Sequence, residues 1–241
     1  QGDAGLLSKW QLGVVGSRNP SRLGRDNAFE FSRFLAHGGL TITSGLSEGI
    51  GAAAHDGALA VKGKTLSVIG SGLDRIYPEK QYGLAQDIVQ EGALVSEFAL
   101  GTSFRSENIP RRNRLISGLS LGVLVVEASS RSGSLDIARM ALEQGREVFS
   151  IPGSIHNPLA KGCHQLIREG AKLVETAEDI IEELGALAGV VEVLEKKEAT
   201  LSNGPQTLDG DYQLLFTCLG YDPIGIDTLA EQSGLTVDIV S

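Results

Sequence analysis

The stretch VVGSR, residues 14–18, decides how this chain folds, because a short apolar run ends there in a small turn and a stretch with helical periodicity follows at 22–37. Similar turns rich in glycine and serine end the apolar runs at 42–45 and 68–72, and another lies at 132–134. A strand that ends in such a turn and leads into a helix presents free backbone N–H groups and the positive end of the helix dipole, both of which bind phosphate oxygens. Several such turns on one sheet predict a row of phosphate-binding positions, which suits a nucleic-acid backbone.

Apolar strands and helical stretches alternate along residues 1–184, which predicts βαβ units and a mostly parallel sheet covered by helices on both faces. We expect strands at 13–15, 40–43, 65–69, 93–95, 121–126, 147–150 and 172–174. We expect helices at 22–37, 50–61, 81–90, 111–118, 134–144, 161–168 and 177–184. The predicted fold class is therefore α/β, with an extended Rossmann-like sheet. Ligands of such sheets bind at the carboxyl ends of the strands, where the glycine and serine turns fall.

A second, smaller module follows the Rossmann-like domain at 1–184. The segment 185–208 has the composition of a linker, and 209–241 has the pattern of a truncated winged-helix-like α domain. In this module we expect short helices at 212–216 and 226–232, and a third that begins at Val237. Its acidic balance argues against DNA binding by the module and favours a protein contact.

The charge of the chain is unevenly distributed. The 241 residues hold 21 Lys and Arg against 30 Asp and Glu, a net charge of −9. Residues 1–184 carry 19 basic and 21 acidic side chains, whereas 185–241 carry 2 and 9, so the acidity belongs mainly to the second module. Four arginines fall in one ten-residue window, at Arg105, Arg111, Arg112 and Arg114. The window predicts a local positive patch for nucleic acid, and a solvated arginine face is the alternative.

Other classes of site find little support. We expect a soluble globular protein, because the longest apolar runs fall far short of the ~20 residues that a membrane span requires. Since the chain begins at Gln1 and shows no targeting signal, we expect that any upstream segment has been removed. Cys163 and Cys218 have no metal spacing and fit a reducing cytosol, so no metal site is expected. For His55 we expect a hydrogen bond in the core and no catalytic role.

A set of short motifs occurs in the order and spacing of one family. The motifs are Val15-Gly16-Ser17-Arg18, Ser44-Gly45-Leu46 with Gly49-Ile50 and Ala54-His55, Gly72-Leu73-Asp74 with Tyr77-Pro78, Ser96-Glu97, Pro110-Arg111-Arg112-Asn113-Arg114-Leu115-Ile116-Ser117-Gly118-Leu119, Val126-Glu127-Ala128, Ser132-Gly133-Ser134-Leu135, Gln144-Gly145-Arg146, Pro152-Gly153-Ser154 and Gly162-Cys163. Over roughly residues 10–184 the chain thereby resembles the DNA-processing protein A family, known as DprA or Smf.

The resemblance implies a bacterial cytoplasmic protein that binds single-stranded DNA taken up in natural transformation, protects it and loads the RecA recombinase on it. It also implies a homodimer with no catalytic activity and no cofactor, and a small winged-helix domain after the Rossmann domain. The chain departs from the family at Ile109, where Phe is frequent. Isoleucine has no π-face on which a base can stack, and Phe104 is the nearby alternative.

The candidate DNA-binding residues are those of the turns and the nearby cations. They are Gly16, Ser17, Arg18, Ser44, Gly45, Gly70, Ser71, Gly72, Arg111, Arg112, Asn113, Arg114, Ser132, Gly133 and Ser134, with Lys80 and Lys161 as weaker additions. Helix capping and plain turn geometry are the alternatives for the glycines and serines. Because Arg111 and Arg114 share a helix face that excludes Arg112, not all three can touch DNA. One arginine is expected to pair with Glu97 or Glu127.

Two other function classes stay open. A nucleotide-processing enzyme of related fold, similar to phosphoribohydrolases, would use a carboxylate such as Glu127 in N-glycosidic cleavage. The chain lacks the Pro-Gly-Gly-x-Gly-Thr run of those enzymes, and its first turn departs from the dinucleotide-binding pattern. An adaptor that contacts only protein is the other alternative.

Overall fold

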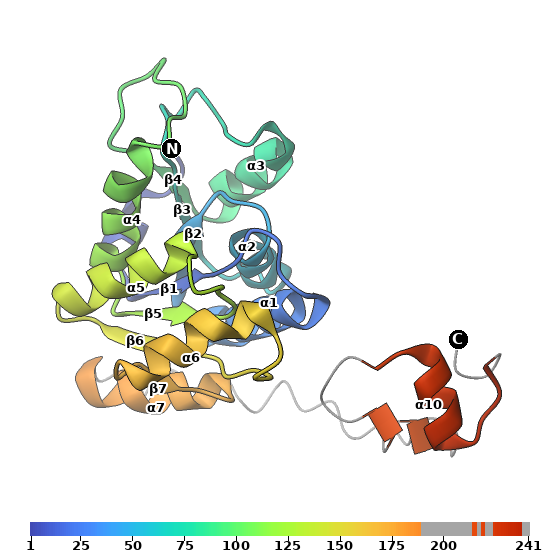
Figure 1. The fold of residues 1–241 in the computed structure, drawn as a ribbon. Coiled ribbons are helices and arrows are strands. Elements are labelled where there is room, and N and C mark those ends of the chain that lie inside the picture. Colours follow the sequence, from blue (N-terminus) through green and yellow to red (C-terminus); the bar gives the residue numbers. More distant parts are fainter. Residues whose placement is uncertain (189–213, 216–217, 220–223, 238–241) are drawn as a thin grey trace. The chain divides into compact units, whose positions relative to one another are not determined.

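The computed structural model describes residues 1–188, 214–215, 218–219 and 224–237 (Figure 1). Contacts between residues divide the chain into two units, Gln1–Glu198 and Ala199–Ser241, which we describe separately. The first unit holds the sheet and the candidate interface.

Seven parallel strands form the sheet of the first unit, in the order β4-β3-β2-β1-β5-β6-β7. The strands are β1 (Gln11–Val15), β2 (Thr41–Gly45), β3 (Thr65–Val68), β4 (Ala93–Val95), β5 (Gly122–Val125), β6 (Glu147–Ser150) and β7 (Lys172–Leu173). The strand order reverses direction between β1 and β5, which pair with Leu12 opposite Gly122. This confirms the predicted Rossmann-like parallel sheet and places its topological switch point at β1 and β5.

Helices cover both faces of the sheet (Figure 1). One face carries α1 (Arg22–His37), α2 (Ile50–Ala60), α3 (Tyr82–Glu91) and α7 (Ala177–Ala188), and the other carries α4 (Asn108–Leu119), α5 (Gly133–Glu143) and α6 (Lys161–Arg168). Short 3-10 helices are η1 (Ala4–Ser8), η2 (Glu79–Gln81) and η3 (Pro158–Ala160).

The central strands are apolar on both faces because both faces are covered. Leu12 and Leu124 pack in the core under α1, α2 and α7, whereas Val123 and Val125 pack under α4, α5 and α6. None of these four side chains has exposed surface. Near-continuous apolar sequence is therefore what a buried parallel strand requires.

Two helices differ from their expected bounds by three or more residues at one end. Helix α4 begins at Asn108, before the expected start at 111, so Pro110 lies in its first turn, where the missing N–H of proline removes no helical hydrogen bond. Helix α7 continues to Ala188, past the expected end at 184.

In the second unit the structure describes α10 (Ile226–Ser233), which the sequence predicts at 226–232. Gly234 ends the helix with φ of +69°, a left-handed conformation that favours glycine. The expected helix at 212–216 and linker at 185–208 lie mostly outside the described residues. None of the described helices is long and apolar enough to cross a membrane.

Candidate nucleic-acid interface

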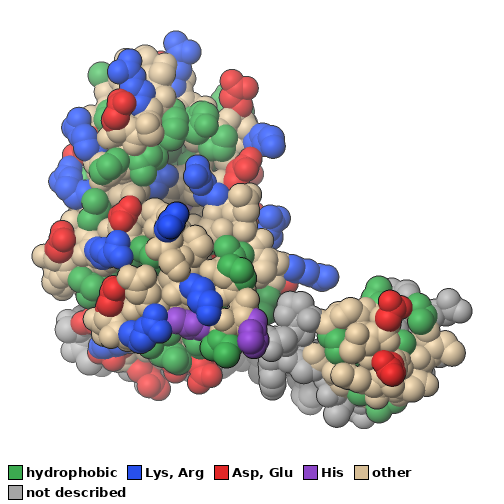
Figure 2. Space-filling view, viewed as in Figure 1, with side chains coloured by type: hydrophobic (Ala, Val, Ile, Leu, Met, Phe, Trp, Pro, Cys, Tyr) green, Lys and Arg blue, Asp and Glu red, His purple; other side chains and the backbone are tan. Residues whose placement is uncertain are grey.

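The carboxyl ends of the parallel strands lie along one edge of the sheet. The turns after β3, β2, β1 and β5 therefore follow one another along this edge, and neighbouring strands of a sheet are about 4.8 Å apart. We call this the carboxyl edge. Figure 2 shows one face of the molecule, on which Lys and Arg side chains are spread over the upper and central part of the first unit.

The turn after β1 is fixed between β5 and α2. The Ser17 N–H donates to the Glu127 carbonyl at 2.7 Å, and the Ile50 N–H donates to the Ser17 carbonyl at 3.0 Å. Only glycine fits at position 16, because a Cβ there would lie 2.7 Å from Cγ1 of Ile50. The Ser17 hydroxyl accepts the Asn19 N–H at 3.1 Å. Arg18 is exposed and, within the described part of the chain, forms no ion pair.

Arg112 of α4 lies over the end of β2. A Cβ added to Gly45 would lie 2.4 Å from Cζ of Arg112, so the glycine makes room for the guanidinium. Nη1 of Arg112 donates to Oδ1 of Asn113 at 3.1 Å. Its Nε is buried without a hydrogen-bond partner in the described structure, and no described carboxylate forms an ion pair with Arg112. The side chain is thus a desolvated cation with an unused donor.

The electrostatics of this position favour an anion. Burial, together with the positive charge of Arg18 as the smaller cause, lowers the pKa of Arg112 to about 10. Both causes mean that the charged guanidinium is held at a cost in free energy. A phosphate oxygen would supply the missing acceptor and compensate both charges, and arginine is well suited to this role.

His55 lies in the core near Arg112. Its Nδ1 is 2.7 Å from Oγ1 of Thr65, which confirms the expected hydrogen bond in the core. Burial lowers the pKa of His55 to about 4, and the charge of Arg112 acts in the same direction. The imidazole is therefore neutral at pH 7.

The other residues of the arginine motif are engaged within the protein. Arg114 pairs with Glu97 at 2.5 Å, as expected for one arginine of the motif, and Arg111 lies 4.0 Å from the same carboxylate. Asn113 is buried. In the described structure these three residues thus have partners inside the protein, and their roles as DNA ligands stay predictions. Arg112 differs from them because its Nε has no hydrogen-bond partner there.

The turn after β3 is closed. Gly70, Ser71 and Gly72 are all buried. The Asn108 side chain donates to the Gly70 carbonyl at 2.7 Å, and the Gly72 N–H donates to the Thr102 carbonyl at 2.9 Å. Asn108 at the start of α4 and Thr102 in the segment before it therefore contact this turn, and its phosphate-binding role stays a prediction.

Serine hydroxyls near the carboxyl edge form hydrogen bonds within the protein. The Ser44 hydroxyl is buried and donates to the Val14 carbonyl at 2.6 Å, and its role as a DNA ligand stays a prediction. Ser132 caps α5, and its Oγ lies 2.6 Å from Oγ of Ser134. Gly133 is exposed, with no atom within 4 Å of an added Cβ, so the first turn of α5 stays accessible.

Of the two lysines, Lys161 is exposed at the start of α6 and forms no ion pair within the described residues. Lys80 lies 3.8 Å from Glu48 in an exposed pair, which contributes little to stability.

Glu127 holds Ser21, the N-cap residue of α1. Its Oε1 accepts the Ser21 hydroxyl at 2.6 Å and its Oε2 accepts the Ser21 N–H at 2.9 Å, just before α1 begins. The carboxylate is only 8% exposed. An internal anion thus occupies the helix N-terminus where Rossmann folds bind the phosphates of dinucleotides.

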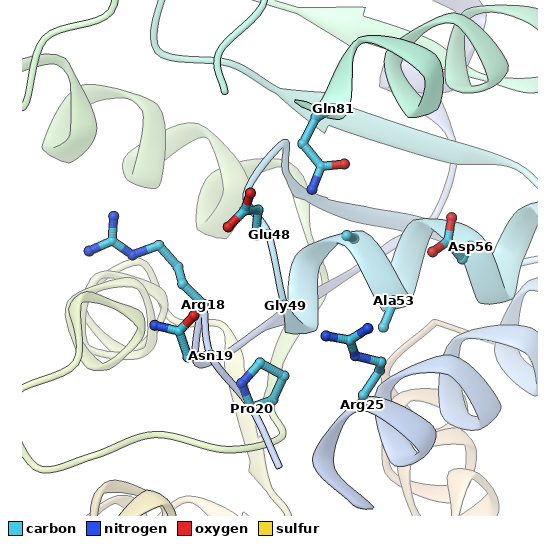
Figure 3. A pocket seen from close by; sticks show the side chains of 10 residues that line it. Arg18, Asn19, Pro20, Arg25, Glu48, Gly49, Ala53, Asp56 and Gln81 are labelled. Atoms are coloured by element: carbon cyan, nitrogen blue, oxygen red, sulfur yellow. The ribbon is translucent and has the colours of Figure 1, made fainter. Parts of the chain in front are cut away.

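A cavity of about 420 Å³ lies beside the first turn. It is lined by Arg18, Asn19, Pro20, Arg25, Glu48, Gly49, Ala52, Ala53, Asp56 and Gln81. Figure 3 shows the guanidinium of Arg25 beside Ala53, and Gln81 reaching toward the start of α2 from the other side. Burial raises the pKa of Asp56, and the negative charge of Asp87 adds to this effect. The sequence analysis missed Arg25 and Gln81, because their approach depends on how α1 and η2 pack around α2.

The described residues contain no group of three or more His, Cys, Asp or Glu side chains that could hold a metal ion.

Comparison with known proteins identifies related sequences for both units. Residues 1–185 match the family model of DNA recombination-mediator protein A, and residues 199–241 match that of the DprA winged helix domain. Protein Smf of Escherichia coli is 52% identical over 185 residues, which are 76% of this chain and 50% of that protein. The chain spans between 50% and 64% of the length of the first curated relatives that it matches.

Two solved structures are also similar. DNA processing protein A from Streptococcus pneumoniae has a TM-score of 0.73 and 44% identity, over 76% of this chain and 64% of that one. DNA processing protein A from Helicobacter pylori, described for its single-stranded DNA binding mode, has a TM-score of 0.70 and 28% identity, over 76% of this chain and 84% of that one.

Proposed function

The chain belongs to the DNA recombination-mediator protein A family, and from that premise we propose that it binds single-stranded DNA through the carboxyl edge of its sheet. One observation carries the proposal: Arg112 and Arg18 lie close enough to repel each other, Arg112 is desolvated, and neither has an ion-pair partner among the described residues. A polyanion that passes along the edge would compensate both cations. Binding through phosphates, glycine turns and arginines does not depend on base sequence.

The proposed DNA path uses the open part of the edge. Arg18 with Gly16 and Ser17, Arg112 with Gly45, and the exposed first turn of α5 would contact phosphates. Arg131, which precedes that helix and is exposed without an ion pair in the described structure, adds a cation. The related H. pylori protein, whose structure was described for its single-stranded DNA binding mode, supports this choice of ligand.

The domain roles are part of the proposal. Residues 1–184 would form the DNA-binding domain, 185–208 the linker, and 209–241 a winged-helix-like module for protein contacts. The charges support this division, because 1–184 are nearly neutral while 185–241 carry a net charge of −7.

We further propose that the protein acts in natural transformation in the cytoplasm, protects incoming DNA as a homodimer and loads RecA on it. The name of the matching family, a recombination mediator, supports this role. The expected result is faster RecA assembly on oligothymidine already coated by a competing single-strand binding protein. Sedimentation of the purified chain tests dimerisation.

We propose that these roles need no catalytic step. Glu127, the carboxylate that a phosphoribohydrolase-like reaction would use, is buried and holds Ser21 with both oxygens. Release of free base from nucleoside monophosphates by the pure protein would favour the enzyme instead.

The direct test is a titration of fluorescent single-stranded and duplex oligonucleotides at two salt concentrations. We expect tighter binding of the single strand, and affinity that falls as salt rises. Arg18→Ala should weaken binding and reduce the salt slope by about 0.7, the value for one phosphate contact on a single strand. Arg33→Ala is the matched control, because Arg33 lies far along α1 and pairs with Glu30. Equal loss in both variants would contradict the assignment of Arg18.

A further inference from the structure

Two aromatic rings stack at the β3 end of the carboxyl edge. Tyr77 lies between β3 and η2, and Phe104 lies between β4 and α4. Their ring centroids are 4.0 Å apart and their planes differ by 14°. Tyr77 is 53% exposed, so Phe104 covers one face of its ring and solvent reaches much of the rest. We call these two residues the aromatic pair.

The aromatic pair continues the proposed DNA path. Atoms of the Phe104 ring lie 3.8 Å from the position of an added Cβ at Gly70, at the end of β3. Asn108, which binds the Gly70 carbonyl, and Arg112 lie one turn apart on α4, and Arg112 covers the end of the neighbouring strand β2. Phe104 thus lies beside the turn after β3, and Arg112 lies over the end of the next strand, β2.

The chain connects the pair to the other end of the path as well. From Tyr77 it runs through η2 to Gln81, which lines the same cavity as Arg18. In Figure 1 the loops near residues 75 and 100 lie together at the top of the first unit. Through Gln81, the segment that carries Tyr77 thus reaches the cavity that Arg18 lines.

Cations surround the aromatic pair. Arg105 follows Phe104 and is exposed without an ion pair among the described residues. Arg75 is 63% exposed with only a long contact of 3.9 Å to Asp74. Figure 2 shows hydrophobic side chains in the upper part of the first unit with Lys and Arg side chains beside them. Flat rings among cations match a nucleobase and its phosphate, and they do not match an aliphatic protein surface.

We propose that the aromatic pair is a stacking platform for a base of the bound strand, with the open face of Tyr77 as its contact surface. This inference rests on the proposed function and adds to it a contact with the bases. Stacking tolerates any base because every base has a π-face, so the platform strengthens binding without selecting a sequence. Phe104 acts as a positioning residue, since it holds the Tyr77 ring from behind.

The test compares two ligands of equal length, oligothymidine and an abasic phosphodeoxyribose chain. Tyr77→Leu keeps an apolar side chain over Phe104 but removes the π-face. We expect it to weaken oligothymidine binding about 5- to 100-fold, equivalent to about 1–3 kcal/mol, and to leave abasic binding unchanged. Tyr77→Trp should retain wild-type affinity for oligothymidine. Tyr82→Leu is the matched control, because Tyr82 is 57% exposed on α3 and takes no part in the stack.

The outcomes separate the inference from the proposed function. If wild-type protein binds neither ligand, the proposed function fails. If it binds both and Tyr77→Leu changes neither affinity, or weakens both equally, stacking is overturned and the aromatic pair only joins two loops. Quenching of 2-aminopurine in a bound oligonucleotide, lost in Tyr77→Leu and kept in Tyr82→Leu, would support stacking independently.

Discussion

Replacing Arg112 by methionine should weaken DNA binding without weakening the fold. Methionine keeps a long side chain over Gly45 but has no charge and no donor. A charge-assisted hydrogen bond contributes about 1.5–3 kcal/mol, so the dissociation constant for oligothymidine should rise about 10- to 100-fold. The salt slope should fall by about 0.7.

The stability of Arg112→Met should not fall with its affinity for DNA, and should stay the same or rise. The charged form of Arg112 is disfavoured by burial and by Arg18, and the fall of its pKa from the usual arginine value to about 10 corresponds to about 3 kcal/mol. The variant loses one hydrogen bond to Asn113, of about 1 kcal/mol, so it should unfold at the same urea concentration as wild type or at a higher one.

Fluorescence anisotropy at several salt concentrations and urea unfolding followed by circular dichroism measure the two effects. Arg114→Met is the control: its exposed pair with Glu97 contributes up to about 1 kcal/mol to stability, and binding should change little. The reasoning is refuted if Arg112→Met unfolds more easily while its affinity for oligothymidine is unchanged, because Arg112 would then be a structural residue.

Three further changes have distinct expected results. Gly45→Ala should weaken oligothymidine binding, because the added Cβ displaces the Arg112 guanidinium, and it should leave the melting temperature unchanged. If anisotropy shows unchanged binding, the guanidinium does not contact DNA. Glu127→Gln should lower the free energy of unfolding in urea by about 2 kcal/mol, since an amide cannot accept both hydrogen bonds of Ser21. A variant as stable as wild type would show that these hydrogen bonds do not stabilise the start of α1. His55 has a pKa of about 4 in the folded protein and near 6.5 in the unfolded chain. The neutral imidazole therefore adds about 3 kcal/mol to the free energy of unfolding above pH 6.5, and this stability is lost as the pH falls toward 4. Between pH 7 and pH 4 the free energy of unfolding should fall less for His55→Gln than for wild type. Equal slopes would show that His55 does not cause the loss of stability at low pH.

Much of the first unit could be predicted from local sequence. All seven expected strands are present, and α1 and α6 have the expected bounds, because apolar runs and helical periodicity report burial directly. The helical spacing also predicted that Arg112 lies on a different face of the helix from Arg111 and Arg114. It could not tell which side of α4 faces the carboxyl edge, since the packing of Ile116 against the sheet decides that orientation.

The closed turn at Gly70 could not be predicted for a related reason. Its sequence has the same glycine and serine pattern as the open turn at Gly16, and the difference comes from Thr102 and Asn108, which are distant in sequence. The stacking of Tyr77 on Phe104 likewise joins two loops that carry no shared local signal. Tertiary contacts therefore determine which turns stay accessible.

The carboxylate that caps α1 has a consequence for selectivity inside a cell. Rossmann domains that use their first helix for phosphate would be filled by abundant metabolites such as ATP and NAD. Here Glu127 already neutralises that helix end, and a second negative group would be repelled. Free nucleotides should consequently bind poorly at this helix end, so that attraction of phosphate to the neighbouring surface depends on the side chains of Arg18 and Arg112.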